Sequence, residues 1–212
     1  MLVFSMALQR ILAVFVMSTL NTIAERTTST STTTIDLSLY QDPIPFLNSS
    51  LTKYLFWTSM TALFMQKVKC VSSTYIGPGK KSDTFRRTLK YIPITPSKNK
   101  VVSVNLLLSV IKDSSTKSTR IEASIQSKDA QPKLKPHSLF NLIVIFADEQ
   151  CLVLQDAPGV LSNYCYMWST GGNKREPSSY CPYIYLTKCT ARFIEAYDSK
   201  SCNDANRINR GR

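Results

Sequence analysis

The sequence predicts an all-β protein: a closed, eight-stranded antiparallel barrel with one short helix before it and one after it. From Tyr54 onward, β-branched and aromatic residues alternate with polar ones at period two, which is typical of half-buried strands. Turn residues interrupt this pattern at short, even intervals, and no helical segment separates the strands. Eight antiparallel strands are the number at which a closed barrel holds one small ligand.

The alternating pattern divides into segments that are bounded by glycine, proline and short polar residues. Turns are predicted at Gly77-Pro78-Gly79 and at Pro158-Gly159, where these residues supply the backbone angles of tight turns. The eight predicted strands are Tyr54–Thr61, Gln66–Ile76, Thr84–Ile94, Val101–Ile111, Thr119–Ser127, Leu139–Ala147, Cys151–Gln155 and Tyr164–Thr170.

Two helices are expected on either side of the barrel. The first begins with Asp42 as the N-cap and Pro43 as the first helical residue, and it ends near Asn48. The second is predicted over Ser178–Thr190, after Pro177. Its aromatic and β-branched residues also suit a strand, so that alternative stays open at this stage.

The N-terminal region predicts secretion. Residues 1–24 resemble a signal peptide, with Arg10 before a short apolar run and Ala24 at the cleavage site. The alternative is a membrane anchor, but the apolar run is too short to span a bilayer. Residues 25–38 form a Thr/Ser-rich flexible leader, either O-glycosylated or plain. The folded domain is predicted at residues 39–203, and residues 204–212 form a basic tail.

The cysteines fit an extracellular protein. The chain has six, an even number, at Cys70, Cys151, Cys165, Cys181, Cys189 and Cys202. In an oxidising compartment they predict three disulfides, although spacing alone leaves fifteen connectivities open. The alternative, a zinc site, needs closely spaced pairs, and the chain contains no C-x-x-C. Asn48-Ser49-Ser50 predicts an N-linked glycan on an exposed segment.

Catalysis is disfavoured, since most general-base, triad and zinc chemistries use histidine, and the chain contains one, His137. His137 is predicted in a surface turn between Pro136 and Ser138. Neither G-x-S-x-G nor H-E-x-x-H occurs, and no catalytic residue, metal or cofactor is expected.

The formal net charge is +12. A nucleic-acid partner is disfavoured because a secreted, disulfide-bonded chain carries that charge without a recognised nucleic-acid module.

Three groups of residues match a family pattern when they are taken in order. The first is the segment from Asp42 to Ser50 with the later Trp57, and the second surrounds Cys70. The third is Cys151-x-Val153-Leu154, Cys165-Tyr166-Met167-Trp168, Pro177, Cys181, Cys189 and Cys202. This set, from about Asp42 to Cys202, resembles the tick salivary lipocalins of the histamine-binding-protein family.

The resemblance implies a lipocalin-like barrel with disulfides Cys70–Cys202, Cys151–Cys181 and Cys165–Cys189. If Cys165 and Cys151 face outward to the C-terminal segment, the alternation of a strand directs their neighbours into the barrel. The residues expected inside are Leu152, Leu154, Tyr164, Tyr166 and Trp168.

The chain differs from the amine-binding members of that family at two positions. Those members carry an acidic residue directly after the cysteines equivalent to Cys151 and Cys165, where this chain has Leu152 and Tyr166. A buried ammonium without a carboxylate is costly. Glu122 is the remaining acid on a predicted strand, with Asp148 and Glu149 at the rim. Trp57, Tyr166 and Trp168 are candidates for an aromatic cage.

The functional expectation is a secreted monomer that sequesters a small host mediator without membrane insertion. The family implies an amine such as histamine or serotonin, whereas the missing acids favour a lipid such as a leukotriene. The predicted ligand-binding residues are Trp57, Glu122, Leu152, Leu154, Tyr164, Tyr166 and Trp168. An ordinary filled core would have the same apolar lining.

The alternative function is a protein- or glycan-binding antagonist of host immunity or haemostasis that uses the barrel only as a scaffold. A host protein or a heparin-like glycan would then bind a basic surface patch. The residues predicted for this patch are Lys80, Lys81, Arg86, Arg87 and Lys90.

Overall fold

The computed structural model describes residues 36–60, 67–94, 100–126, 138–157, 164–171, 180–189, 192–198 and 202. The predicted signal peptide, most of the Thr/Ser-rich leader, the basic tail and His137 lie outside the described residues.

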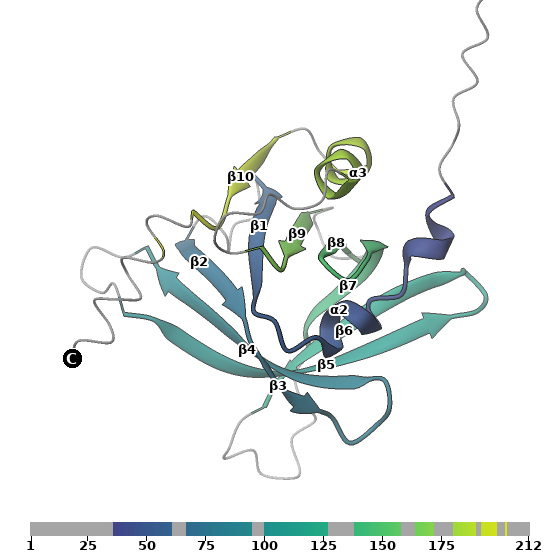
Figure 1. Cartoon of the computed structure of the whole chain (residues 1–212), viewed down its shortest axis with the longest axis horizontal. Coiled ribbons are helices and arrows are strands. Elements are labelled where there is room, and N and C mark those ends of the chain that lie inside the picture. Colours follow the sequence, from purple (N-terminus) through teal and green to yellow (C-terminus); the bar gives the residue numbers. More distant parts are fainter. Residues whose placement is uncertain are drawn as a thin grey trace, which may run out of the picture. The chain divides into compact units, whose positions relative to one another are not determined.

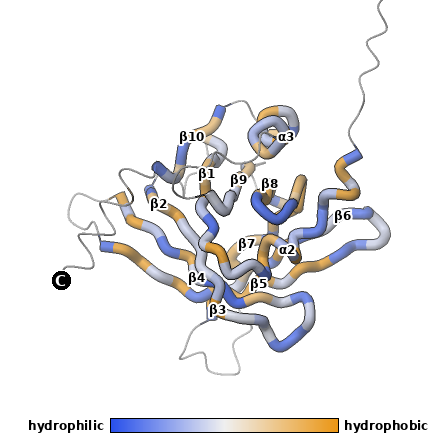
Figure 2. Tube along the Cα trace, in the orientation of Figure 1, coloured by the Kyte–Doolittle hydropathy of each residue, from blue (hydrophilic) through white to orange (hydrophobic). Residues whose placement is uncertain are grey.

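Eight strands form a closed antiparallel barrel, as predicted (Figure 1). Each strand pairs with the next around the barrel, and the last strand pairs with the first from Tyr54↔Ser169 to Thr58↔Tyr166. The barrel strands are β1 (Lys53–Ser59), β2 (Val68–Ser73), β4 (Thr84–Pro93), β5 (Val102–Asp113), β6 (Ser118–Ile125), β7 (Ser138–Ala147), β8 (Cys151–Asp156) and β9 (Cys165–Ser169). Figure 2 shows hydrophobic and hydrophilic residues interspersed along β2 and β4.

Two further strands were not predicted. The predicted strand Gln66–Ile76 is interrupted at Thr74, so its second part is the separate strand β3 (Tyr75–Pro78), which pairs with β4. Thr74 is held by Thr88, whose N–H donates to the Thr74 carbonyl at 2.8 Å. The strand β10 (Phe193–Glu195) pairs with β1 outside the barrel and is too short to show a period.

The N-terminal helices are short and depend on aspartate side chains. Leu37–Tyr40 forms a 3-10 helix, η1, with the Asp36 carboxylate accepting from the Ser38 N–H at 3.0 Å. The helix α2 (Ile44–Asn48) begins one residue later than predicted, because Pro43 is the N-cap. The carboxylate of Asp42 still accepts from the N–H of Ile44 at 3.2 Å.

The C-terminal segment forms the helix α3 (Tyr180–Lys188), so the predicted helix is confirmed and the strand alternative is wrong. Disulfides Cys151–Cys181 and Cys165–Cys189 attach it to β8 and β9. The third disulfide, Cys70–Cys202, joins β2 to the C-terminal segment. All three pairs are those that the family resemblance implied.

The predicted basic patch is wrong at Arg87, which is buried. Lys80, Lys81 and Arg86 are exposed and Lys90 is half-buried, but Arg87 is only 1% exposed. Alternation along β4 explains the error, since Arg87 shares the inner face with the buried Phe85. The patch was inferred from charge clustering alone, which ignores strand parity.

The Arg87 guanidinium is held by backbone carbonyls from two parts of the chain. Nη1 donates to the carbonyls of Leu47 and Ser49 at 2.8 and 2.9 Å. Nη2 donates to the carbonyls of Leu51 and Ser73 at 3.0 and 3.2 Å. Nε donates to the Ser73 hydroxyl at 3.0 Å. One side chain therefore fastens the segment between α2 and β1 to the end of β2.

We predict that Arg87→Met lowers the free energy of unfolding by about 3–5 kcal/mol, because it leaves several carbonyls without donors. The neighbouring Arg86→Met is the control, since Arg86 is exposed and should cost less than about 1 kcal/mol. Urea denaturation of both variants measures the difference. Equal losses in the two variants would contradict the structural role assigned to Arg87.

Candidate ligand-binding cavity

The barrel contains a cavity of about 130 Å³. Each of the eight barrel strands contributes two lining residues spaced two apart, such as Leu106 and Leu108 of β5, and α2 adds Phe46 and Leu47. Apart from Lys53, Ser73 and Arg87, the described lining residues are aliphatic or aromatic.

Four of the five residues that were predicted to point into the barrel line the cavity, and Tyr164 does not. Leu152 and Leu154 of β8 line the cavity, as do Tyr166 and Trp168 of β9. Their neighbours on the other face form a buried cluster that packs with α3, and it includes Cys151, Val153, Cys165 and Met167. The two disulfides to α3 thus fix which face of β8 and β9 points inward.

Trp57 lies outside the cavity. Its ring stacks on Phe193 at 4.1 Å between centroids and meets the edge of Tyr185 at 5.7 Å. The β1–β9 register shifts between Leu55 and Trp57, so a bulge ends the alternation that places Leu55 inside.

The other predicted ligand-binding residues are also not among the lining residues. Tyr164 precedes β9 and packs against a cluster that contains Leu55 and Val68. Glu122 is half-buried between Ile121 and Ala123, both of which line the cavity, so alternation directs Glu122 to the other face. At the rim, the Asp148 carboxylate accepts from the Gln150 and Cys151 N–H groups, while Glu149 is exposed.

Lys53 is a functional candidate that the sequence analysis missed. The residue is 1% exposed, and its Nζ lies 4.2 Å from the centre of the Phe46 ring. This Nζ has no hydrogen-bond partner among the described residues. Burial, with repulsion from Arg87, lowers the pKa of Lys53 to about 8. The ammonium is therefore mostly protonated at pH 7 despite its surroundings.

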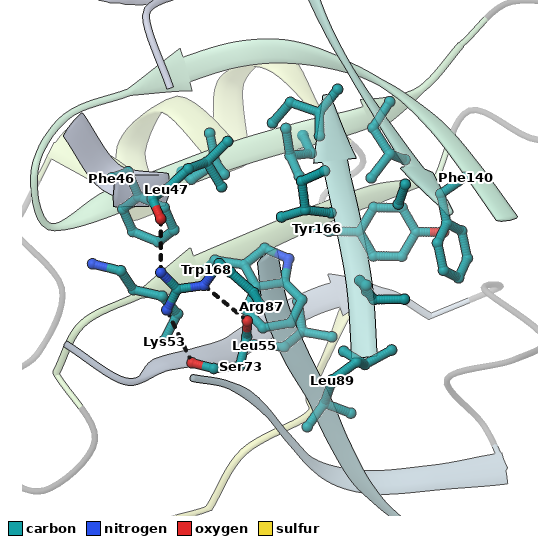
Figure 3. Close-up of a pocket in the computed structure, with 18 residues that line it drawn as sticks. Phe46, Leu47, Lys53, Leu55, Ser73, Arg87, Leu89, Phe140, Tyr166 and Trp168 are labelled. Atoms are coloured by element: carbon teal, nitrogen blue, oxygen red, sulfur yellow. Dashed lines mark hydrogen bonds between the residues drawn. The ribbon is translucent and has the colours of Figure 1, made fainter. Parts of the chain in front are cut away.

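Arg87 is the second cation of the cavity. Burial lowers its pKa to about 10, while the nearby Tyr75 favours the charged form, so Arg87 is charged at neutral pH. None of the lining residues that the structure describes is an aspartate or glutamate. In Figure 3, Phe46, Lys53 and Arg87 lie on one side of the cavity, and Phe140 lies on the other, next to the ring of Tyr166.

Tyr166 is linked to a buried acid that was also missed. Asp156 lies two residues beyond Leu154, so it shares the inner face of β8. The Tyr166 hydroxyl donates a hydrogen bond to the Asp156 carboxylate. Burial and this carboxylate raise the pKa of Tyr166 well above its usual range. Extending the alternation by one step beyond the predicted strand end would have found Asp156.

Neither a metal-binding cluster nor a membrane-spanning helix is found in the described part of the chain. No group of three or more His, Cys, Asp or Glu side chains there is arranged to hold a metal ion. None of the described helices is both long and apolar enough to cross a bilayer.

We predict that Lys53→Met raises the free energy of unfolding at pH 7 by about 1–3 kcal/mol, because it removes a buried ammonium without an acceptor. The gain depends on pH. Lys53 has a pKa of about 8 in the folded protein against 10.5 for the unperturbed side chain. Between these values the unfolded chain binds more protons, so wild-type stability at this site rises with pH.

Denaturation of wild type and Lys53→Met at pH 7 and pH 10 measures this difference. The advantage of the variant should shrink at pH 10, where the unfolded lysine is losing its proton as well. An advantage that is absent at pH 7, or equal at both pH values, would contradict the assignment.

Comparisons with known proteins agree with the fold. A family model described as tick histamine binding protein matches residues 32–204. Japanin from Rhipicephalus appendiculatus, solved bound to cholesterol, is similar with a TM-score of 0.53 and 19% identity over 73% of this chain and 97% of japanin. The AM182 serotonin complex gives a TM-score of 0.45 and 11% identity over 73% of this chain and 88% of AM182. A comparison with curated proteins finds no match. The chain, with its closed barrel and three disulfides, belongs to the tick histamine binding protein family.

Proposed function

We propose that this protein is a secreted lipocalin that sequesters a small apolar mediator of the host in its barrel, without chemical conversion. The observation that carries the proposal is the cavity, to which every barrel strand contributes two residues and which is lined almost entirely by apolar side chains. A cavity of this kind, with a few placed polar groups, is the usual form of a small-molecule site.

Secretion is supported by the cysteines. All six are paired in disulfides. Such bonds persist in oxidising compartments and are rare in the cytosol. The predicted signal peptide over residues 1–24 also supports secretion. The resemblance of the chain to tick salivary lipocalins implies release into a host.

The charges of the cavity favour a lipid over an amine. Leu152 and Tyr166 occupy the two positions that are acidic in the amine-binding members of the family. The nearby acid, Asp156, accepts a hydrogen bond from Tyr166 and is not among the lining residues. Lys53 and Arg87 would repel an ammonium group, and such repulsion is strong in a medium of low dielectric.

We expect native mass spectrometry of the secreted, deglycosylated protein to show retention of one lipid at 1:1 stoichiometry. The protein would be offered an equimolar mixture of histamine, serotonin, a leukotriene and arachidonate. Preferential retention of an amine would contradict the lipid assignment. If none of the four were retained by folded protein, the small-molecule proposal would fail, and heparin binding at the exposed Lys80, Lys81 and Arg86 would be tested next.

The two tryptophans provide an internal control for the binding site. Trp168 lines the cavity, whereas Trp57 stacks on Phe193 outside it. A retained lipid should change the intrinsic fluorescence of Trp57→Phe, which keeps Trp168, and should leave that of Trp168→Phe nearly unchanged. The opposite pattern would place the ligand outside the barrel.

A further inference from the structure

We infer that the cavity binds a long-chain carboxylate, whose anionic group is held by the ammonium of Lys53. This inference rests on the proposed function and names the chemical class of its ligand. Its starting point is the combination of an apolar cavity with a buried cation that has no hydrogen-bond partner among the described residues.

Packing alone does not explain Lys53. An apolar side chain of similar length would fill the same space at the start of β1 without burying a charge. The Phe46 ring, 4.2 Å from Nζ, offers a cation–π contact but accepts none of the three N–H bonds. A buried charge without a partner is rare in folded proteins, and such groups occur most often at functional sites.

Arg87 is not available for the same role. Its N–H groups already donate to four backbone carbonyls and to the Ser73 hydroxyl. These neutral acceptors satisfy its hydrogen bonds but leave its positive charge uncompensated. Arg87 therefore adds positive potential at this side of the cavity, while the Lys53 ammonium has no partner among the described residues and can donate to an anion.

The arrangement of the cavity fits an amphipathic ligand. Lys53 and Arg87 lie on one side, and the lining on the opposite side, near Phe140, is apolar (Figure 3). A carboxylate close to Lys53 would leave its hydrocarbon chain among the leucines of β5 and β8. The four-carbon stem of lysine is flexible, so rotation of this stem moves the ammonium from Phe46 towards the cavity that the side chain lines.

A series of ligands with one chain length and different head groups tests the inference. Isothermal titration calorimetry at pH 7 would compare dodecanoate, dodecanol and dodecylamine, each below its critical micelle concentration. We expect wild-type protein to bind dodecanoate about tenfold or more tightly than dodecanol, with dodecylamine the weakest. In Lys53→Met, dodecanoate should bind no better than dodecanol, while the affinity for dodecanol stays within about twofold of wild type.

Lys90→Met is the matched control, since Lys90 lies on the outer face of β4 and does not line the cavity. This variant should keep the preference for dodecanoate. Lys53→Gln is a second variant that removes the charge while keeping a polar side chain, and it should also lose the preference for dodecanoate. The comparison of dodecanoate with dodecanol in wild-type protein does not depend on either variant.

The outcomes separate the inference from the proposed function. Equal binding of dodecanoate and dodecanol by wild type would overturn the anion site but leave the apolar cavity as a binding site. A preference for dodecanoate that survives in Lys53→Met would also overturn the role of Lys53. Failure of all three compounds to bind would overturn both proposals.

Discussion

The Arg87 guanidinium is the interaction on which this barrel's ligand cavity depends. It reaches from the inner face of β4 to the carbonyls of Leu47, Ser49 and Leu51, which connect α2 to β1. These carbonyls have no sheet partner of their own, and buried carbonyls need donors. By supplying the donors, Arg87 holds Phe46 and Leu47 against the cavity and positions the start of β1, where Lys53 lies.

Two disulfides fix the outer side of the barrel at β8 and β9. The two disulfides to α3 require Cys151 and Cys165 to face outward, and strand alternation then places Leu152, Leu154, Tyr166 and Trp168 inside. Covalent bonds therefore determine the apolar lining of β8 and β9, whereas hydrogen bonds to Arg87 determine the polar side of the cavity. The two arrangements share no residue, since the disulfides join β8 and β9 to the C-terminal segment and Arg87 joins β4 to the segment between α2 and β1.

The parts of the site that the sequence predicted are those that follow from uninterrupted alternation. Leu152 and Tyr166 were placed correctly because each lies within a regular strand, next to a cysteine that was assumed to face outward, whereas Tyr164 precedes β9 and is not among the lining residues. Trp57 was not placed correctly, because a bulge in β1 reverses the alternation between Leu55 and Trp57. Nothing in the local sequence marks this bulge. Lys53 and Arg87 were missed for another reason: charged residues are mostly exposed, so composition assigns them to the surface unless parity is followed through each strand.

The charges inside the barrel determine which ligands it favours. The positions that follow Cys151 and Cys165 hold Leu152 and Tyr166, neither of which is an acid that could pair with a cationic ligand. The cavity is nevertheless charged, since Lys53 and Arg87 line it and none of the described lining residues is a carboxylate. A simple loss of amine binding would leave an apolar lumen, because an uncompensated ammonium destabilises the fold. The anionic ligand inferred above would offset the cost of burying Lys53, because it would accept the hydrogen bonds that the ammonium lacks among the described residues.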